Sequence, residues 1–359
     1  MRVTAKMIAD ELGLSIATVD RVLNNRKGVS EKTINKVKSK AQELGYQPNR
    51  AAKFLATQKV INIAFILPVF PNYFWDDLDH EIKEGATLYS DFGLRVDVHR
   101  VHTVPENQQV EYLQEIVDSK KYEGIVIAAH DTKPLEKIID QATKENIAVF
   151  TINTDVPNSQ RIAYVGSDYY DAGFLAGELI CLFSSSAQNI IFIREKENTF
   201  QMQNKENGFT DYFKKKDLNI QLQKIKYDTS AYIEAEKVEK LLKDHKEMLM
   251  NADAIYVAGG LLDKIIPNIE EWENKPVIIG HDINETIYRA FQKDLITASI
   301  CQDPIAQANF SLKKIMNYFL DDNISHISSY IVKPEIVTKA NTKYYINNEN
   351  NLINKQEND

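Results

Sequence analysis

From Val60 onward, short strand-like runs alternate regularly with stretches of helical periodicity, and this alternation constrains the fold more than any other feature. The strand-like runs are apolar and rich in Ile and Val, whereas the intervening stretches repeat apolar residues at helical spacing. The predicted strands are 61–67, 94–98, 124–129 and 148–152 in a first series, and 190–194, 220–227, 254–258 and 277–280 in a second. Alternating β and α elements indicate parallel sheets with helices on both faces, so the two series predict two α/β lobes.

The first sixty residues follow a different pattern, which predicts three short helices and a linker. Thr4, Ser15 and Ser30 each precede a run of helical periodicity and can cap it. Gly13 and Gly45 follow the first and third runs, where helices commonly end. The second helix begins after a turn of only a few residues, which is the spacing of a helix-turn-helix. The alternative is a small three-helix unit of some other kind.

The charges of this N-terminal segment favour a nucleic-acid partner. Residues 1–59 carry 12 Lys and Arg against 5 Asp and Glu, whereas the remainder carries 31 against 46. A basic head on an acidic body indicates that only the head meets a polyanion, although charge alone does not separate nucleic acid from an anionic membrane. Arg21 and Asn24 on the outer face of the second helix have side chains that read guanine and adenine edges. Arg26 and Lys27 beside them would neutralise phosphates.

Four segments in order resemble the headpiece of the LacI/GalR family of transcription regulators: IADELGLS at 8–15, ATVDRVLN at 17–24, VSEKT at 29–33 and LGYQPNRAA at 44–52. The resemblance covers residues 3–59 and implies base contacts by Ile16, Ala17 and Arg21. It also implies phosphate contacts or helix caps at Thr4, Ser15, Thr18, Asn24, Ser30 and Thr33. Because Ile16 and Ala17 are apolar, Arg21 should dominate direct readout. Asp20 stands where the family commonly has Ser, which leaves the operator sequence open.

Residues Pro48 to Gln58 resemble the hinge helix of the same family. Such a helix is too short to be stable alone, so it is expected to fold when two copies meet on DNA. The resemblance implies that Leu55 wedges into the minor groove and kinks the operator, with Ala52 and Asn49 contacting DNA nearby. The alternative is a plain linker that contains a hydrophobic residue.

Several function classes find no support in the chain. It has no G-x-G-x-x-G, Walker A, G-x-S-x-G or H-E-x-x-H sequence, so neither an enzyme nor a cofactor is predicted. His99 and His102 should point to opposite faces of one strand, which disfavours a shared metal. Cys181 and Cys301 are too few for a disulfide framework. The apolar runs are too short to span a membrane and the amino terminus resembles no signal peptide, so a cytoplasmic protein is predicted.

Polar and aromatic residues gather where predicted strands end, at 71–75, 153–155, 281–282 and 302–304. Ligands of parallel α/β folds bind at the carboxyl ends of strands. Aromatic rings stack on the C–H faces of sugars, while Asn, Asp and Gln side chains bind adjacent hydroxyls. Each residue taken singly could instead be a loop or cap residue, and Asp168 and Asp303 are predicted to be helix N-caps.

The body is also similar to the periplasmic sugar-binding fold (type I, ribose-binding-like) over roughly residues 60–340. The similarity is carried by GIVI at 124–127, DYYDAG at 168–173, GHD at 280–282 and ICQDP at 300–304, together with the helix-like stretch 75–90. It implies ligand contacts at Asn72, Phe74, Trp75, Asn153, Asp282 and Gln302. Gln203 stands near where relatives often place a ligand-clamping Arg, and Gly259 or Gly260 replaces a frequent Asn. A missing Arg argues against a phosphorylated or carboxylated ligand.

These observations predict an all-α helix-turn-helix headpiece at 1–47, a hinge at 48–59, a two-lobed α/β domain at 60–340 and a polar tail at 341–359. The lobes are predicted to comprise 60–163 with 293–322, and 164–290 with 323–340. The tail, rich in Asn, Lys and Glu, is predicted to be a short strand or to be frayed.

The resemblance implies a homodimeric repressor that binds double-stranded operator DNA. A mono- or small saccharide between the lobes would set the operator affinity, as an inducer or a co-repressor. A dimer is predicted because no tetramerising heptad is visible near the carboxyl end. The alternative is a sugar-binding protein of a transport or sensing system, which needs an export signal and lacks a DNA-reading head.

Overall fold

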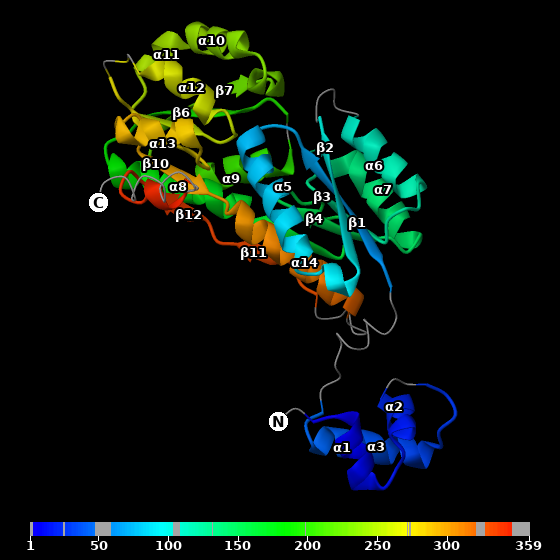
Figure 1. Ribbon diagram of the computed structural model, residues 1–359. Helices are drawn as coiled ribbons and strands as arrows, with labels where there is room; N and C mark the ends of the chain where they lie inside the picture. The colour runs from blue at the N-terminus through cyan, green and yellow to red at the C-terminus, as the bar shows by residue number, and fades with distance from the viewer. Residues whose placement is uncertain are drawn as a thin grey trace, which may run out of the picture. The chain divides into compact units, whose positions relative to one another are not determined.

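The computed structural model describes residues 3–23, 26–46, 59–102, 108–130, 132–197, 199–270, 272, 274–320 and 327–346. It divides into two compact units, Met1–Lys59 and Val60–Asp359 (Figure 1). Asn24 and the hinge residues Asn49, Ala52 and Leu55 lie outside the described residues, so their roles stay predictions.

The first unit consists of the three predicted helices, α1 (Ala5–Leu12), α2 (Ile16–Leu23) and α3 (Glu31–Glu43). Each predicted cap is in place. Thr4 Oγ1 accepts a hydrogen bond from the Met7 amide at 3.3 Å, Ser15 Oγ accepts from the Thr18 amide, and Ser30 Oγ accepts from the Thr33 amide. Gly13 ends α1 with φ 62°, a left-handed conformation that glycine adopts without strain. The helices close around a small core of Ile8, Ala9, Val19, Val22, Val37 and Ala41.

Two six-stranded sheets form the second unit. The first has the order β11-β5-β4-β3-β1-β2, and the second has the order β12-β10-β9-β8-β6-β7. The strands of the first sheet are β1 (Ile61–Pro68), β2 (Leu94–Val101), β3 (Gly124–Ile127), β4 (Ala148–Ile152), β5 (Ala163–Ser167) and β11 (Tyr330–Val332). Those of the second are β6 (Asn189–Glu195), β7 (Gln221–Tyr227), β8 (Ala254–Val257), β9 (Val277–His281), β10 (Ala298–Cys301) and β12 (Glu335–Val337). All neighbouring strands are parallel except β10 and β12.

Helices cover both faces of each sheet, which is why β3, β4 and β8 are buried along their whole length (Figure 1). Those of the first sheet are α5 (Asn72–Thr87) and α14 (Pro304–Leu320) on one face, and α6 (Gln108–Asp118) and α7 (Thr132–Lys144) on the other. Those of the second are α8 (Tyr169–Phe183) and α9 (Phe200–Lys215) on one face, and α10 (Ala235–Asp244), α11 (Lys246–Met250), α12 (Leu262–Ile269) and α13 (Glu285–Gln292) on the other.

The predicted lobe boundaries are corrected at three strands. Prediction assigned β10 to the first lobe, and most of β5 together with β11 to the second, but strand pairing places β5 and β11 in the first sheet and β10 in the second. The chain therefore crosses between the sheets three times, near Asp168, at Gln302–Asp303 and at 333–334. Strand partners are distant in sequence, so local periodicity does not reveal which sheet a strand joins. One consequence is that Gln302 lies directly on a crossing.

The start of the predicted polar tail is part of the folded unit. Thr342 is 1% exposed within the turn η4 (Thr342–Tyr344), and its hydroxyl donates to the Lys339 carbonyl at 3.1 Å. The frayed or strand-like interpretation is therefore wrong for this part, whereas 347–359 lie outside the described residues. Across the described portion of the chain, no helix combines the length and apolar character that a membrane crossing requires.

Candidate functional site

A cavity lies within the second unit at the carboxyl ends of both sheets. Its volume is about 710 Å³, counting the space open to solvent. Residues at the ends of β1, β3 and β4 line it from the first sheet, and residues at the ends of β6, β8, β9 and β10 line it from the second. This is where parallel α/β folds bind ligands.

An aromatic wall borders the cavity at the start of α5. Phe74 and Trp75, both predicted, are 4% and 5% exposed and pack edge to face with ring centroids 5.0 Å apart. The Trp75 indole N–H donates to the Phe70 carbonyl at 3.0 Å, and Phe70 also lines the cavity. Asn72, by contrast, is exposed and is not among the lining residues. Asn72 is the first residue of α5, and its contact with a ligand stays a prediction.

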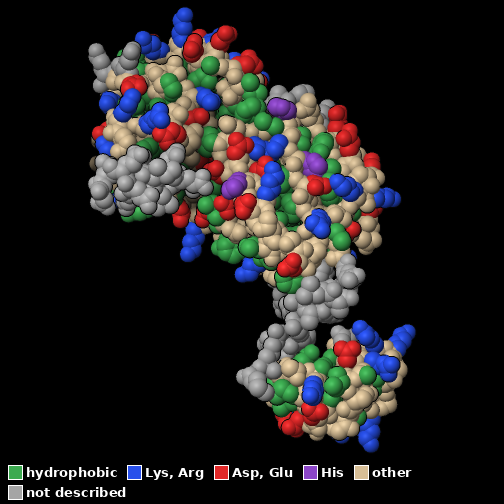
Figure 2. Space-filling view, in the orientation of Figure 1, with side chains coloured by type: hydrophobic (Ala, Val, Ile, Leu, Met, Phe, Trp, Pro, Cys, Tyr) green, Lys and Arg blue, Asp and Glu red, His purple; other side chains and the backbone are tan. Residues whose placement is uncertain are grey.

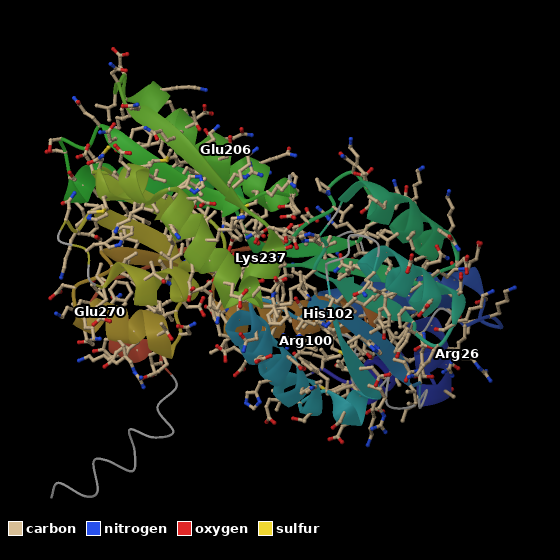
Figure 3. All side chains as sticks on the ribbon, turned by 90° about the horizontal axis from the view of Figure 1, so that it is seen from above. Arg26, Arg100, His102, Glu206, Lys237 and Glu270 are labelled. Atoms are coloured by element: carbon tan, nitrogen blue, oxygen red, sulfur yellow. The ribbon has the colours of Figure 1, made fainter. Side chains whose placement is uncertain are left out.

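Arg100 holds the loop that carries this wall. Its guanidinium donates to the Pro68 and Val69 carbonyls at 2.9 and 3.0 Å and to the Asp76 carboxylate at 2.7 Å. Figure 3 labels Arg100 beside His102, whose ring lies 6.0 Å from that of Phe70. One side chain of β2 therefore connects the end of β1 to the first turn of α5.

Asn153, Asp282 and Gln302, also predicted, lie together in the cavity. Asn153 and Asp282 adopt left-handed φ values of 58° and 57°, which Asn and Asp tolerate better than other residues with a Cβ. The Gln302 side-chain amide donates to Asp282 Oδ2 at 2.9 Å, and its backbone N–H donates to Oδ1 at 3.2 Å. The hydroxyls of Tyr164 and Tyr169 donate to the Asn153 carbonyl at 2.5 and 2.6 Å. These bonds hold the backbone of Asn153 and the side chains of Asp282 and Gln302 in place.

Four buried polar atoms that border the cavity have no hydrogen-bond partner among the described residues. They are Asn153 Nδ2, Gln302 Oε1, Thr229 Oγ1 and His130 Nε2. Buried polar groups are normally hydrogen-bonded, so an unpartnered set at one cavity indicates a ligand position. The set contains a donor, an acceptor and two groups that can act as either, which matches a molecule with several hydroxyls.

Helix α9 contributes a lysine that the sequence analysis missed. Gln203, predicted to line the site, is exposed, whereas Gln201 and Lys205 line the cavity. Residues 201 and 205 share one face of the helix at a four-residue spacing, and residue 203 points elsewhere. Lys205 is 1% exposed and its ammonium donates to the Ala258 carbonyl at 2.7 Å. The sequence analysis considered only an Arg as the cation of this site. Lys205, a cation three residues before Gly208, could have been identified from the sequence.

The charged groups among the described lining residues are one ammonium, Lys205, and two carboxylates, Asp282 and Glu195. Burial lowers the pKa of Lys205 to about 8, against the opposing effect of Asp282 and Glu195. Burial raises the pKa of Asp282 to about 6, against the opposing effect of Lys205. Glu195 is a second carboxylate in the lining, and the Tyr232 hydroxyl donates to it. No arginine is found among the described lining residues, which disfavours a phosphate group in this cavity.

His281 is held as a neutral structural group at the end of β9. Its Nε2 accepts from the Tyr256 hydroxyl at 2.7 Å and its Nδ1 donates to the Ile300 carbonyl at 3.2 Å. Burial, followed by the charge of Lys205, lowers the pKa of His281 well below its usual range. His281 therefore adds no charge near neutral pH.

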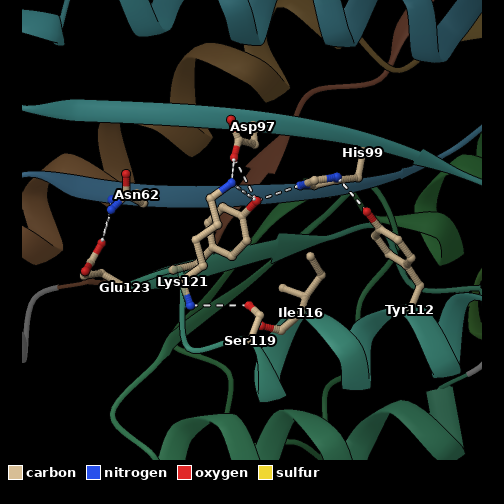
Figure 4. Close-up of polar contacts among 9 residues, drawn as sticks. Asn62, Asp97, His99, Tyr112, Ile116, Ser119, Lys121 and Glu123 are labelled. Atoms are coloured by element: carbon tan, nitrogen blue, oxygen red, sulfur yellow. Dashed lines mark hydrogen bonds and ion pairs between the residues drawn. The ribbon is translucent and has the colours of Figure 1, made fainter.

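His99 lies in a separate network on β2 (Figure 4). The Tyr112 hydroxyl lies 2.7 Å from its Nδ1, and the Tyr122 hydroxyl lies 3.1 Å from its Nε2. Tyr122 in turn donates to Asp97, which also accepts from Lys121. Across the described ranges, no group of three or more His, Cys, Asp or Glu is arranged to hold a metal ion.

The first unit presents the outer face of α2 to solvent. Ile16 is 50% exposed, and Ala17 and Arg21 are also exposed, whereas Val19 and Val22 are buried on the opposite face. Arg26 and Lys27 follow in exposed positions, and Asp20 accepts from Arg26 at 3.5 Å. The remaining predicted residues Thr4, Ser15, Thr18, Ser30 and Thr33 lie at the amino ends of the three helices. Helix amino ends and exposed cations both suit phosphate contacts.

These features define a class of protein: a helix-turn-helix unit in the same chain as a two-sheet unit with a cavity at the carboxyl ends of its strands. Comparison with known families places the chain within that class. Residues 63–320 match the periplasmic binding protein domain, and residues 4–49 match the bacterial regulatory proteins of the lacI family. The chain belongs to the lacI family of bacterial regulatory proteins. This membership agrees with the family predicted from the sequence.

The individual relatives share less than 30% sequence identity with this chain. Catabolite control protein A of Priestia megaterium is 29% identical over 194 residues, which is 54% of this chain and 55% of that protein. The sucrose operon repressor of Lactococcus lactis subsp. lactis is 27% identical over 192 residues, 54% and 56% of the two chains. The chain thus spans about half the length of the curated relatives it matches.

Solved structures support the fold of the second unit. The glucose-galactose binding protein GanP of Geobacillus stearothermophilus has a TM-score of 0.66 at 22% identity, covering 79% of this chain and 99% of that one. An ABC transporter solute binding protein of Burkholderia graminis C4D1M, solved with D-arabinose, has a TM-score of 0.68 at 17% identity, covering 81% and 99%. At such identities the similarity shows the type I periplasmic-binding-protein-like fold.

Proposed function

We propose that this chain is a cytoplasmic, homodimeric repressor whose affinity for operator DNA is set by an uncharged mono- or small saccharide bound in the cavity of the second unit. The observation that carries the proposal is the set of unpartnered buried polar atoms facing an aromatic wall. A helix-turn-helix unit in the same chain gives the cavity something to regulate. That unit also favours a regulator over a transport protein that binds sugar alone.

Three properties of the cavity support a sugar. The indole of Trp75 and the ring of Phe74 can stack on apolar C–H faces. Asn153 and Gln302 place a free donor and a free acceptor where adjacent hydroxyls can bind both. The balance of one ammonium against two carboxylates suits a neutral ligand better than an anion. Similar structures include a glucose-galactose binding protein and one solved with D-arabinose.

The surface of α2 supports base readout by one dominant residue. Arg21 can donate two hydrogen bonds to guanine, while Ile16 and Ala17 beside it offer apolar contacts to thymine methyl groups. Two such units related by a two-fold axis would read a near-palindromic operator. Repression is supported by the similarity to a sucrose operon repressor. The hinge contacts of Asn49, Ala52 and Leu55 remain part of the proposal.

Strand β1 offers a physical route from ligand to DNA. It begins at Ile61, directly after the linker, and ends at Pro68, which lines the cavity. A ligand that draws the two sheets together would act on the end of β1 and so on the linker that precedes it. The ligand can shift operator binding only by its different affinity for the two states, so induction and co-repression are both compatible with this route.

Thermal unfolding against a panel of neutral pentoses and hexoses, uronic acids and sugar phosphates tests the proposal. A neutral sugar at 100 times its dissociation constant should stabilise the protein by about 2.7 kcal/mol. The Trp75→Ala variant should lose most of this shift, whereas Leu88→Ala, an exposed position after α5, should keep it. A response to sugar phosphates alone, or to no sugar at all, would contradict the neutral-saccharide assignment.

A further inference from the structure

A second cavity shares only part of its wall with the first. Its volume is about 940 Å³, counting the space open to solvent. It is bordered by the first turns of α5, the ends of β9 and β10, the start of β12 and the turn at 344–345. Phe74 and Asp282 line both cavities, and the other lining residues differ. We call it the acidic cavity, for the carboxylates described next.

Five carboxylates border the acidic cavity: Asp77, Glu81, Asp282, Asp303 and Glu335. No Lys or Arg occurs among the described residues that line the acidic cavity. The first cavity, which we call the ligand cavity, is lined by Lys205. Figure 2 shows acidic side chains, in red, gathered at the hollow between the two halves of this unit beside α5. Burial and the neighbouring Asp76 and Glu81 raise the pKa of Asp77. The carboxylates therefore repel one another, and a bound cation would relieve that repulsion.

The wall is aromatic as well as acidic, and it contains an unsatisfied group. Tyr73, Phe74 and Tyr345 contribute rings, and the exposed side chains of Tyr344 and Ile305 continue the apolar surface at the margin. The Tyr73 hydroxyl is buried and has no hydrogen-bond partner among the described residues. A buried hydroxyl is normally bonded, so its free state indicates that a ligand atom belongs beside it. Aromatic faces attract ammonium and guanidinium groups.

We propose that the acidic cavity binds a small organic cation, with one or more ammonium or guanidinium groups on a short apolar chain. The carboxylates come from α5, from β12 and from the residues that follow β9 and β10, so they surround a volume instead of converging on a point. That spacing suits charges distributed along a chain. A divalent metal is disfavoured, because no group of three or more candidate ligands in the described ranges is arranged to hold one.

Isothermal titration of the full chain with agmatine and with spermidine, at constant ionic strength, tests this proposal. Sodium chloride and 1,4-butanediol serve as the screening and uncharged controls. We expect saturable binding of at least one cation with one-to-one stoichiometry. Glu81→Gln and Glu335→Gln should each weaken it about ten-fold, because each removes a charge-assisted contact while keeping the side-chain shape. Both variants should unfold at or above the wild-type midpoint, since they remove like-charge repulsion.

The matched control is Glu84→Gln, which removes the same charge from the same helix at an exposed position that does not line the cavity. It should leave cation affinity unchanged. If neither agmatine nor spermidine gives a larger binding signal than sodium chloride at the same ionic strength, the proposal is overturned. It is also overturned if Glu84→Gln weakens binding as much as Glu81→Gln, because the cations would then respond to overall charge.

Discussion

At the residue scale, Asp282 is the residue of the second unit whose backbone, hydrogen bonds and charge all bear on ligand binding. It has a left-handed backbone, it accepts two hydrogen bonds from Gln302, and it borders both cavities. Burial acts against its charge and Lys205 acts in favour of it. A ligand hydroxyl that donates to this carboxylate would therefore meet a group that is already oriented and incompletely neutralised.

The raised pKa of Asp282 predicts a specific pH dependence of stability. Between its ordinary value of 3.8 and its folded value of about 6, the folded protein binds more protons at this group than the unfolded chain does. Its contribution to the free energy of unfolding is therefore largest below about pH 4 and falls as the pH rises to about 6. Urea unfolding at pH 4.5 and pH 7 should show wild type losing stability relative to Asp282→Asn over this interval. A constant difference between the two proteins would show that the carboxyl titrates normally.

The exposed position of Arg21 on α2 predicts that its side chain contributes to operator recognition. Arg21→Ala should reduce the preference for the operator over random DNA by about 1–3 kcal/mol, because one pair of guanine contacts is lost. Residual non-specific binding should keep its dependence on salt. Fluorescence anisotropy with an operator selected from a random pool measures both.

Lys27→Ala, an exposed cation beside α2, is the matched control for that experiment. It should weaken operator and random DNA alike and reduce the salt slope by about one. An Arg21→Ala protein with unaltered operator preference would show that the outer face of α2 does not read bases.

At the scale of elements, the close contact of α8 with α9 sets the position of Lys205. Gly208 and Gly173 lie at the contact, where a Cβ at Gly208 would come within 1.9 Å of the Tyr170 carbonyl oxygen. A Cβ at Gly173 would come within 2.0 Å of the Lys205 carbonyl oxygen. The two helices approach this closely only because both positions lack a side chain. Helix α9 consequently directs Gln201 and Lys205 into the cavity.

This contact predicts that Gly208→Ala changes both stability and ligand affinity. The added methyl forces α8 and α9 apart, which should cost about 1–3 kcal/mol in unfolding free energy. It should also weaken ligand binding, because Lys205 moves with its helix. Asn207→Ala, at an exposed position one residue earlier, should have little effect on either quantity. Urea unfolding measures the stability of each variant, and ligand titration measures its affinity. Equal stability and equal affinity of Gly208→Ala and Asn207→Ala would contradict the role of the helix contact.

At the scale of the whole molecule, the two sheets are connected by three crossings of the chain, and a ligand bound beside these crossings can contact both sheets. Asn153 follows strand β4 of the first sheet, Asp282 follows strand β9 of the second, and Gln302 lies on a crossing between the sheets. A ligand that contacts all three ties the sheets together. Strand β1 then extends from this region to the linker that precedes the second unit.

The proposed coupling predicts reciprocal effects on binding. If a ligand changes operator affinity by some factor, operator DNA must change ligand affinity by the same factor, which typically lies between about 5- and 150-fold. Operator titrations with and without ligand, and ligand titrations with and without operator, provide the two ratios. A ligand that binds in the cavity without changing operator affinity would show that the cavity does not regulate the DNA-binding unit.

Local chemistry determined much of this protein from its sequence alone. Caps and apolar spacing act over a few residues, which is why Thr4, Ser15 and Ser30 begin the expected helices. Asp168 and Asp303 likewise accept from backbone amides at the starts of α8 and α14, as predicted. The order of motifs identified the family, and the aromatic and amide residues at strand ends located most of the ligand cavity.

Tertiary structure alone decided the remainder, because it depends on contacts between residues distant in the chain. Strand pairing, and not periodicity, assigned β5 and β11 to the first sheet and β10 to the second. The packing of α8 on α9 placed Lys205 in the cavity and Gln203 outside it. The acidic cavity likewise exists only because four separate segments bring carboxylates to one place. Such burial and charge are properties of the assembled fold, since no local segment contains the groups that produce them.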